Sequence, residues 1–90
     1  MKSFEEQCDL ALSLLNRISA KYDLDEYEKR AIQYMVIRVQ NFNRKNALSA
    51  KHRGELSRMV QEFDPRKLGA DLGALLISIE KLYFDSSQKA

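Results

Sequence analysis

Apolar residues recur every three or four positions along most of this chain, and that spacing is the strongest constraint on its fold. The first apolar face follows steps of 4, 3, 4, 3 and 4 through Phe4, Cys8, Ala11, Leu15, Ile18 and Tyr22. Because an α-helix turns once in about 3.6 residues, this spacing lines one side of a helix, which Leu12 and Leu14 widen. Ser3 and Glu6 have the spacing of a capping box, in which each side chain bonds the other residue's amide. We therefore expect a helix over residues 4–22.

A second helix is predicted over residues 26–43. Asp25 is its expected N-cap, and Glu28 follows three residues later. Val36 and Ile37 broaden its apolar surface, which indicates burial on more than one side. The residues predicted to form its inner face are Tyr27, Ala31, Ile32, Met35, Val39 and Phe42.

A third helix is predicted over residues 49–63, with the Ser49 hydroxyl as its N-terminal cap. Gly54 falls inside this segment and costs a helix about 1 kcal/mol relative to alanine. The apolar side chains expected to point inward are Leu56, Met59, Val60 and Phe63.

A fourth helix is predicted to begin at Asp64 and Pro65, because an N-cap acid followed by proline at the first helical position is a typical start. The apolar spacing continues through Gly69, which favours one helix over residues 65–84. The alternative is a short turn at residues 64–69 followed by a new helix capped by Asp71. The residues that keep the helical phase are Leu68, Leu72, Leu75, Ile79 and Leu82.

Four helices of similar length with short connections predict an all-α, single-domain antiparallel four-helix bundle with up-down-up-down topology. The chain of 90 residues holds only three Gly and one Pro, which leaves few positions that interrupt a helix. We expect a bundle domain over residues 1–84 and a frayed tail over 85–90. In this layout Phe42 and Phe84 lie at the same end of the bundle. The alternative architecture is a three-helix bundle whose last helix mediates dimerisation.

The sequence lacks the motifs that catalysis or metal binding would require. One cysteine permits neither an intrachain disulfide nor a cysteine-based zinc site. No phosphate loop or dinucleotide fingerprint occurs. Cys8 and His52 fall near the same end of the predicted bundle, but no third group is available to orient a Cys–His pair. We therefore expect a protein that is not an enzyme and has no catalytic residues, cofactor or metal.

Charge is distributed unevenly along the chain. Residues 29–54 hold seven Lys or Arg and no acid, whereas residues 1–28 hold seven acids and three bases. The net charge of +2 is low for a protein dedicated to nucleic acid. This balance favours a protein partner with an acidic surface, and a nucleic-acid-binding regulator that uses residues 29–58 is the alternative. Neutralisation of the basic corner, residues 41–54, is also open through Glu5, Glu6 and Asp9.

The second helix carries a possible docking face. Tyr34 lies at the boundary of its inner face, beside Val36, Ile37 and two arginines, and an apolar strip rimmed by charge is typical of a docking surface. We expect a small regulator, adaptor, immunity protein or inhibitor. The residues predicted to contact the partner are Arg30, Tyr34, Arg38, Arg44, Lys45, Lys51 and Arg53.

Gly69 and Gly73 are one helical turn apart, and such spacing lets a second helix approach closely. Packing inside the bundle is the favoured interpretation, and a homodimer seam is the alternative. The N-terminal residues are acidic where a signal peptide is apolar, and no apolar run reaches the roughly 18 residues that span a bilayer. We therefore expect no membrane association and a cytoplasmic protein.

Overall fold

The computed structural model describes residues 3–44 and 52–88, with side chains up to residue 85. Within these ranges the protein is helical and contains no strand, which confirms the all-α prediction. None of these helices is both long enough and apolar enough to cross a membrane. The helices are α1 (Phe4–Lys21), α2 (Glu26–Asn43), α3 (Glu55–Glu62), α4 (Pro65–Leu68) and α5 (Ala70–Gln88).

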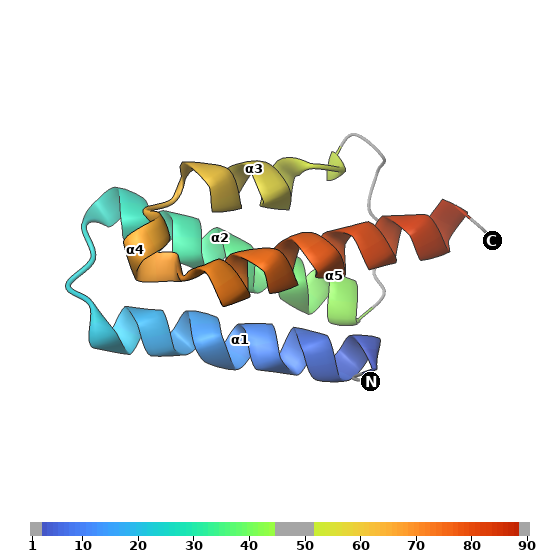
Figure 1. Ribbon diagram of the computed structural model, residues 1–90, viewed down its shortest axis with the longest axis horizontal. Coiled ribbons are helices and arrows are strands. Elements are labelled where there is room, and N and C mark those ends of the chain that lie inside the picture. The colour runs from blue at the N-terminus through green and yellow to red at the C-terminus, as the bar shows by residue number, and fades with distance from the viewer. Residues whose placement is uncertain (1–2, 45–51, 89–90) are drawn as a thin grey trace.

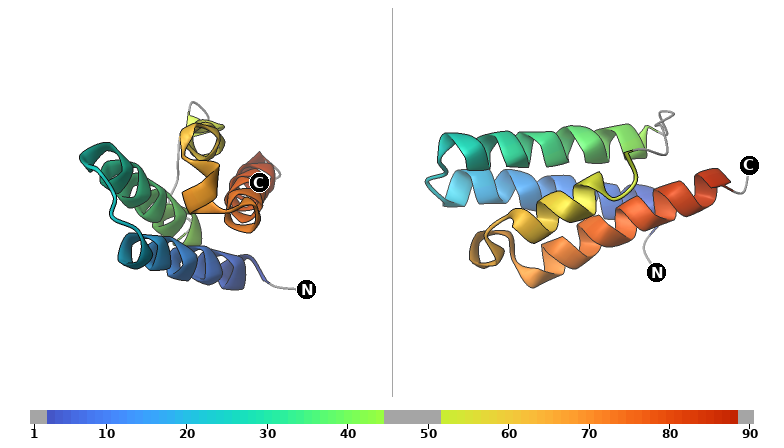
Figure 2. Two further views of the ribbon diagram at one scale, coloured as in Figure 1. Left: turned by 60° about the vertical axis from the view of Figure 1, so that its left-hand side comes forward. Right: turned by 90° about the horizontal axis from the view of Figure 1, so that it is seen from above.

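The helices pack around a shared core in a body of 42 × 29 × 19 Å. α1 lies along α2, and α5 contacts α1, α2 and α3 (Figure 1). The short helix α4 sits beside the C-terminal end of α1 and leads into α5. Figure 2, in its left-hand view, shows α1, α2, α3 and α5 surrounding the centre of the molecule.

The starts of α1 and α2 follow from local sequence. Ser3 Oγ accepts a hydrogen bond from the Glu6 amide at 3.1 Å, and the Glu6 carboxylate accepts one from the Ser3 amide at 3.3 Å. Asp25 and Glu28 repeat this reciprocal arrangement, with distances of 2.7 and 3.2 Å. Both capping boxes are confirmed, and each satisfies amides that a helix leaves without an internal acceptor.

The third helix begins later than predicted. Residues 52–54 form a turn, and α3 starts only at Glu55. Gly54 has a φ of +89°, a left-handed conformation that glycine adopts easily and that cannot continue a right-handed helix. The predicted helix over 49–63 is therefore wrong for residues 52–54, while Ser49 lies outside the described residues.

The predicted single helix over 65–84 is also wrong, because the helix is interrupted at Gly69. This residue has a φ of +88° and separates α4 from α5. Asp64 caps α4 as predicted, accepting a hydrogen bond from the Arg66 amide at 2.9 Å. The alternative of a short turn before a new helix is closer, although Asp71 lies in the first turn of α5 instead of capping it. α5 continues to Gln88, so residues 85–88 are helical, whereas a frayed tail was predicted there.

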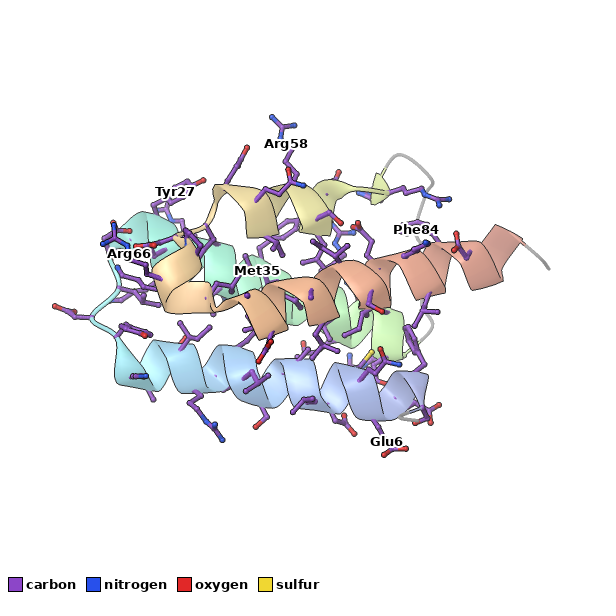
Figure 3. The ribbon with its side chains drawn as sticks, viewed as in Figure 1. Glu6, Tyr27, Met35, Arg58, Arg66 and Phe84 are labelled. Atoms are coloured by element: carbon purple, nitrogen blue, oxygen red, sulfur yellow. The ribbon has the colours of Figure 1, made fainter. Side chains whose placement is uncertain are left out.

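Most of the residues predicted for the inner faces of the helices are buried in the core. Figure 3 shows Met35 between the helices at the centre of the molecule. Phe42 and Phe84 pack together with ring centroids 6.0 Å apart, as predicted for one end of the bundle. The buried residues from α1 and α2 are Cys8, Ala11, Leu15, Ile18, Ala31, Ile32, Met35, Val39 and Phe42, together with Arg38.

Two predicted core positions are exposed instead. Tyr27 points away from the molecule (Figure 3), and Leu82 lies on the outer side of α5. The break at Gly69 leaves most of the predicted apolar face in place, because Leu68, Leu72 and Ile79 are buried, and only its last position, Leu82, turns outward. The principal buried residues of α5 are Leu72, Leu76, Ile79, Glu80, Tyr83 and Phe84.

Candidate docking surface

The solvent-facing side of α2 carries a second regular stripe, which we call the outer stripe. Its residues follow steps of 3, 4, 3, 4 and 3, and such spacing keeps them on one side of the helix. Except for the half-buried Asn41, all are exposed. The members of the outer stripe are Tyr27, Arg30, Tyr34, Ile37, Asn41 and Arg44.

The outer stripe holds much of the exposed apolar surface. Among the described residues, five large hydrophobic side chains are exposed, and three of them belong to this stripe: Tyr27 at 66%, Tyr34 at 38% and Ile37 at 49%. The other two, Ile77 at 39% and Leu82 at 41%, are on α5. Such a concentration on one helix face is a common property of binding surfaces.

Two arginines flank these apolar residues. Arg30 and Arg44 are exposed, and neither forms an ion pair with the part of the chain that the structure describes. Arg44 is the C-cap of α2, where a cation also interacts favourably with the helix dipole. The outer stripe therefore combines apolar contact area with positive charge.

Arg38 does not belong to this surface, although it was predicted to contact the partner. Only 7% of Arg38 is exposed, and its Nη2 donates to Glu55 Oε2 at 2.9 Å and to the Tyr34 hydroxyl. Tyr34 in turn donates to Glu55 Oε2 at 2.7 Å. The Arg38 side chain points towards α3, so its guanidinium pairs with Glu55 and positions the Tyr34 ring instead of facing a partner.

Glu55 is the acceptor at the centre of this junction between α2 and α3. The Tyr34 hydroxyl, the nearby His52 and the Arg38 guanidinium together hold the pKa of the Glu55 carboxyl below its usual value. Burial and the bond to Glu55 raise the pKa of Tyr34. His52 Nδ1 lies 3.2 Å from the Glu55 carboxylate, and Cys8 is fully buried in the core, so the considered Cys–His pair does not form.

Glu80 is a structural residue that sequence reasoning missed. Only 4% of this residue is exposed, and its carboxylate accepts hydrogen bonds from the Leu56 amide at 3.0 Å and the Ser57 hydroxyl at 2.7 Å. Gly54, the N-cap of α3, provides no side-chain bond, so Glu80 caps α3 from another helix. Glu80 lies one helical turn after the buried Leu76, on the same side of α5. An acidic residue at a position whose spacing predicts burial is the sequence signal that would have identified it.

The basic corner is only partly described. Arg53 Nη2 lies 3.1 Å from Asp85 Oδ1, and the guanidinium lies 6.0 Å from the centroid of the Phe84 ring. Asp85 thus pairs with one of the predicted contact residues, as Glu55 does with Arg38. Lys45 and Lys51 lie outside the described residues.

The possibility that Glu5, Glu6 and Asp9 neutralise this corner finds no support among the described residues. Glu6 is used in the capping box of α1, and no ion pair is described for Glu5 or Asp9. The described arginines that are neutralised find their acids elsewhere, on α3 and α5. Of the described arginines in the second helix and the basic corner, Arg30 and Arg44 are therefore the ones left without an ion pair among the described residues.

The two glycines predicted to share a helix face have different roles. Gly73 is buried in α5, and a Cβ there would lie 3.2 Å from Val60 Cγ1, which supports its predicted role in close packing. Gly69 is exposed, has open space around it and is needed for its positive φ. Because Gly69 precedes α5, the pair does not form the single helix face on which the homodimer alternative depended.

Over the described ranges, no group of three or more His, Cys, Asp or Glu side chains is placed to hold a metal ion. The polar side chains that are brought together, at Glu55 and at Glu80, instead connect α3 to its neighbours. No family model matches the chain, and no curated protein or solved structure is significantly similar to it.

Proposed function

We propose that this chain is a small non-enzymatic protein–protein interaction module, acting as a regulator, adaptor, immunity protein or inhibitor. It docks an acidic helix of its partner on the outer stripe of α2, beside the basic corner. The observation that carries the proposal is the regular three-and-four spacing of exposed apolar and basic side chains on that helix. A repeat of about 3.5 residues is the spacing by which two helices pair side by side.

The chemistry of the outer stripe specifies the partner helix. Tyr27, Tyr34 and Ile37 offer apolar side chains that a partner helix can bury, and Arg30 and Arg44 favour acids beside its apolar seam. From Tyr27 to Arg44 the stripe extends about 25 Å along the helix. One seam of this length is smaller than a standard protein interface, so we expect a transient complex in which charge mainly accelerates association.

Three finer structural predictions remain part of this proposal. The fold is an antiparallel up-down-up-down four-helix bundle of α1, α2, α3 and α5, in which α4 leads into the last helix. Residues 1–84 form a single domain, and the protein acts in the cytoplasm. The contacts of α5 with α1, α2 and α3 support the first of these, because a bundle requires its last helix to cover the others.

A designed acidic peptide tests the surface directly. A three-heptad helix with Leu at the seam and Glu at its flanks is titrated into the labelled full-length chain, and amide shifts are followed by NMR. We expect saturable shifts along α2, and their loss in the double variant Tyr27→Ala, Ile37→Ala. The matched control is Ile77→Ala with Leu82→Ala, which removes similarly exposed side chains from α5. An equal loss of affinity for the peptide in both double variants would count against the proposal.

A nucleic-acid-binding regulator that uses residues 29–58 is the alternative function. The acid-free sequence from Lys29 to Gly54 favours it. The ion pairs of Arg38, Arg53 and Arg58 with carboxylates oppose it, because they reduce the charge available to phosphate. It predicts binding to DNA or RNA with an affinity that falls by orders of magnitude between about 50 and 200 mM salt. Affinity for the acidic peptide without affinity for either nucleic acid would exclude this alternative.

A further inference from the structure

A groove of about 370 Å³ lies where the C-terminal half of α1 faces α4 and the start of α5. Figure 1 shows these elements side by side, at the end of the molecule where α1 finishes. The groove shares no residue with the outer stripe of α2. Its volume lies at the lower end of the range of about 300–1,000 Å³ that small-molecule sites occupy.

The floor of the groove is apolar and belongs to the core. Ile18, Leu68 and Leu72 are buried there, and Leu14 and Tyr22 are half-buried at its sides. Because these side chains pack against the rest of the core, the floor is held in place before any ligand arrives. An apolar group placed on it would lose contact with water without a rearrangement of the helices.

Four basic residues from two distant parts of the chain line the same groove, and Asp71 is the one acid among its lining residues. Arg17 and Lys21 lie one turn apart on α1, are exposed, and form no ion pair with the described part of the chain. Arg66 is exposed at this end of the molecule (Figure 3).

The fourth base and the nearby acids limit how much of this charge is available. Lys67 Nζ lies 2.8 Å from Glu28 Oε2, so its charge is already balanced. Arg66 Nε is 3.8 Å from Asp64, a distance too long for a good hydrogen bond. Lys21 Nζ lies 5.3 Å from the centroid of the Tyr22 ring, a weaker interaction than an ion pair. Arg17, Lys21 and Arg66 are therefore the cations available to a ligand.

We propose that this groove binds a small amphipathic anion, a molecule with one phosphate or carboxylate head group and an apolar body. The apolar body lies over Ile18, Leu68 and Leu72. The head group is held by Lys21 and by the guanidinium groups of Arg17 and Arg66, whose planar donors suit phosphate and carboxylate oxygens. A ligand needs both parts to match the groove. A head group alone would find no polar partner on the apolar floor, and an apolar body alone would leave the basic edge in contact with water.

The test uses octyl phosphate and octanoate, below the concentrations at which they form micelles, with octanol and inorganic phosphate as probes of each half. Each is titrated into the labelled full-length protein and followed by NMR. We expect octyl phosphate or octanoate to shift the amides of residues 14–22 and 66–72 in a saturable manner. The tighter of the two identifies the head group. Octanol and inorganic phosphate should each bind at least about tenfold more weakly.

Charge variants assign the site. Arg17→Gln with Lys21→Gln should weaken binding of the amphipathic anion by at least about tenfold. The matched control, Lys29→Gln with Lys81→Gln, removes the same amount of charge at exposed positions of α2 and α5 outside both surfaces and should leave the affinity unchanged. Helix content measured by circular dichroism verifies that both variants fold. The proposal is overturned if neither amphipathic anion binds saturably, if inorganic phosphate binds as tightly, or if both double variants weaken binding equally.

Discussion

Replacing Glu80 with alanine removes the cap of α3 without touching that helix. The carboxylate accepts two hydrogen bonds from the start of α3, one from the buried Leu56 amide and one from the Ser57 hydroxyl. Gly54 precedes the helix and supplies no side-chain acceptor. The substitution therefore leaves a buried amide without its acceptor, and the hydroxyl of Ser57 without the partner it has now.

The expected cost follows from these two contacts. A hydrogen bond to a charged group contributes about 1.5–3 kcal/mol, and an unsatisfied buried amide costs about 1–3 kcal/mol. Desolvation of the carboxylate offsets part of the gain, so the contributions do not simply add. We expect Glu80→Ala to lower the free energy of unfolding by about 3 kcal/mol, and Glu80→Gln, which keeps an oxygen acceptor, by about 1 kcal/mol. For a domain of this size 3 kcal/mol corresponds to a fall in Tm of about 15 °C.

The assay is urea unfolding at neutral pH followed by circular dichroism, combined with hydrogen exchange at the Leu56 amide. Lys81→Ala is the matched control, because Lys81 is the exposed neighbour on the same helix. Exchange at Leu56 should accelerate in Glu80→Ala beyond the change that global destabilisation causes. A free energy of unfolding within about 0.5 kcal/mol of the parent protein, or equal effects of the alanine and glutamine variants, would refute the reasoning.

Three further predictions concern other parts of the fold. Gly69→Ala should lower the free energy of unfolding, measured in urea, by about 1–3 kcal/mol, because a φ of +88° strains a residue with a side chain. Gly73→Ala should leave the free energy of unfolding nearly unchanged, because the gain in helix propensity offsets the tight contact of the new Cβ with Val60. Burial, reinforced by neighbouring carboxylates, raises the pKa of Cys8 to about 11 from an ordinary value of 9.0, so at pH 8 the folded protein should hold about a hundredfold less thiolate and react slowly with a thiol reagent. Glu55 has a lowered pKa in the folded state, so its contribution to stability is present above its ordinary pKa and lost as the pH falls through the lowered value. Glu55→Gln should therefore lessen the fall in the urea midpoint between pH 7 and 3.

Each of these has a result that would contradict it. Equal destabilisation by the two glycine variants would mean that the break between α4 and α5 is not set by backbone conformation. Rapid modification of Cys8 under native conditions would place the thiol at the surface. An identical loss of stability on acidification in Glu55→Gln and the parent protein would show that this carboxyl does not couple folding to pH.

Sequence reasoning succeeded where the determinants of structure are local. The capping boxes at Ser3 and Asp25 each lie within four residues, and the apolar phase of α1 and α2 continues without interruption. The start of α2 and the end of α1 were accordingly predicted to within one residue. Short-range hydrogen bonds and a single helical period are sufficient information for these elements.

It failed where the determinants are distant in the chain. Gly54 and Gly69 adopt a positive φ that their local sequence permits but does not require, and the breaks they make delay the start of α3 and separate α4 from α5. The cap of α3 comes from Glu80, 24 residues after Leu56. Arg38 is buried because α3 brings Glu55 to it, which no periodicity within α2 reveals.

The candidate docking surface was predicted in part for the same reason. Arg30, Tyr34 and Arg44 were identified from charge and from their position beside the inner face of the second helix, and all three are exposed. Tyr27 was assigned to the core because it lies four residues before Ala31 of the inner face, although it also lies three residues before Arg30 of the outer stripe. Arg38 was assigned to the surface because of its charge. Only the packing of neighbouring helices distinguishes the two sides at those positions.

Photo-crosslinking in cells that naturally make the protein tests the central claim, that the outer stripe of α2 is a docking surface, most directly. A photoreactive amino acid replaces Ile37 on α2 or, as the control, the similarly exposed Ile77 on α5. Position 37 should give a dominant product with one protein, joined within an acidic helix, and Arg30→Glu should suppress that product. Products of equal yield from positions 37 and 77, or a product with nucleic acid alone, would contradict the account.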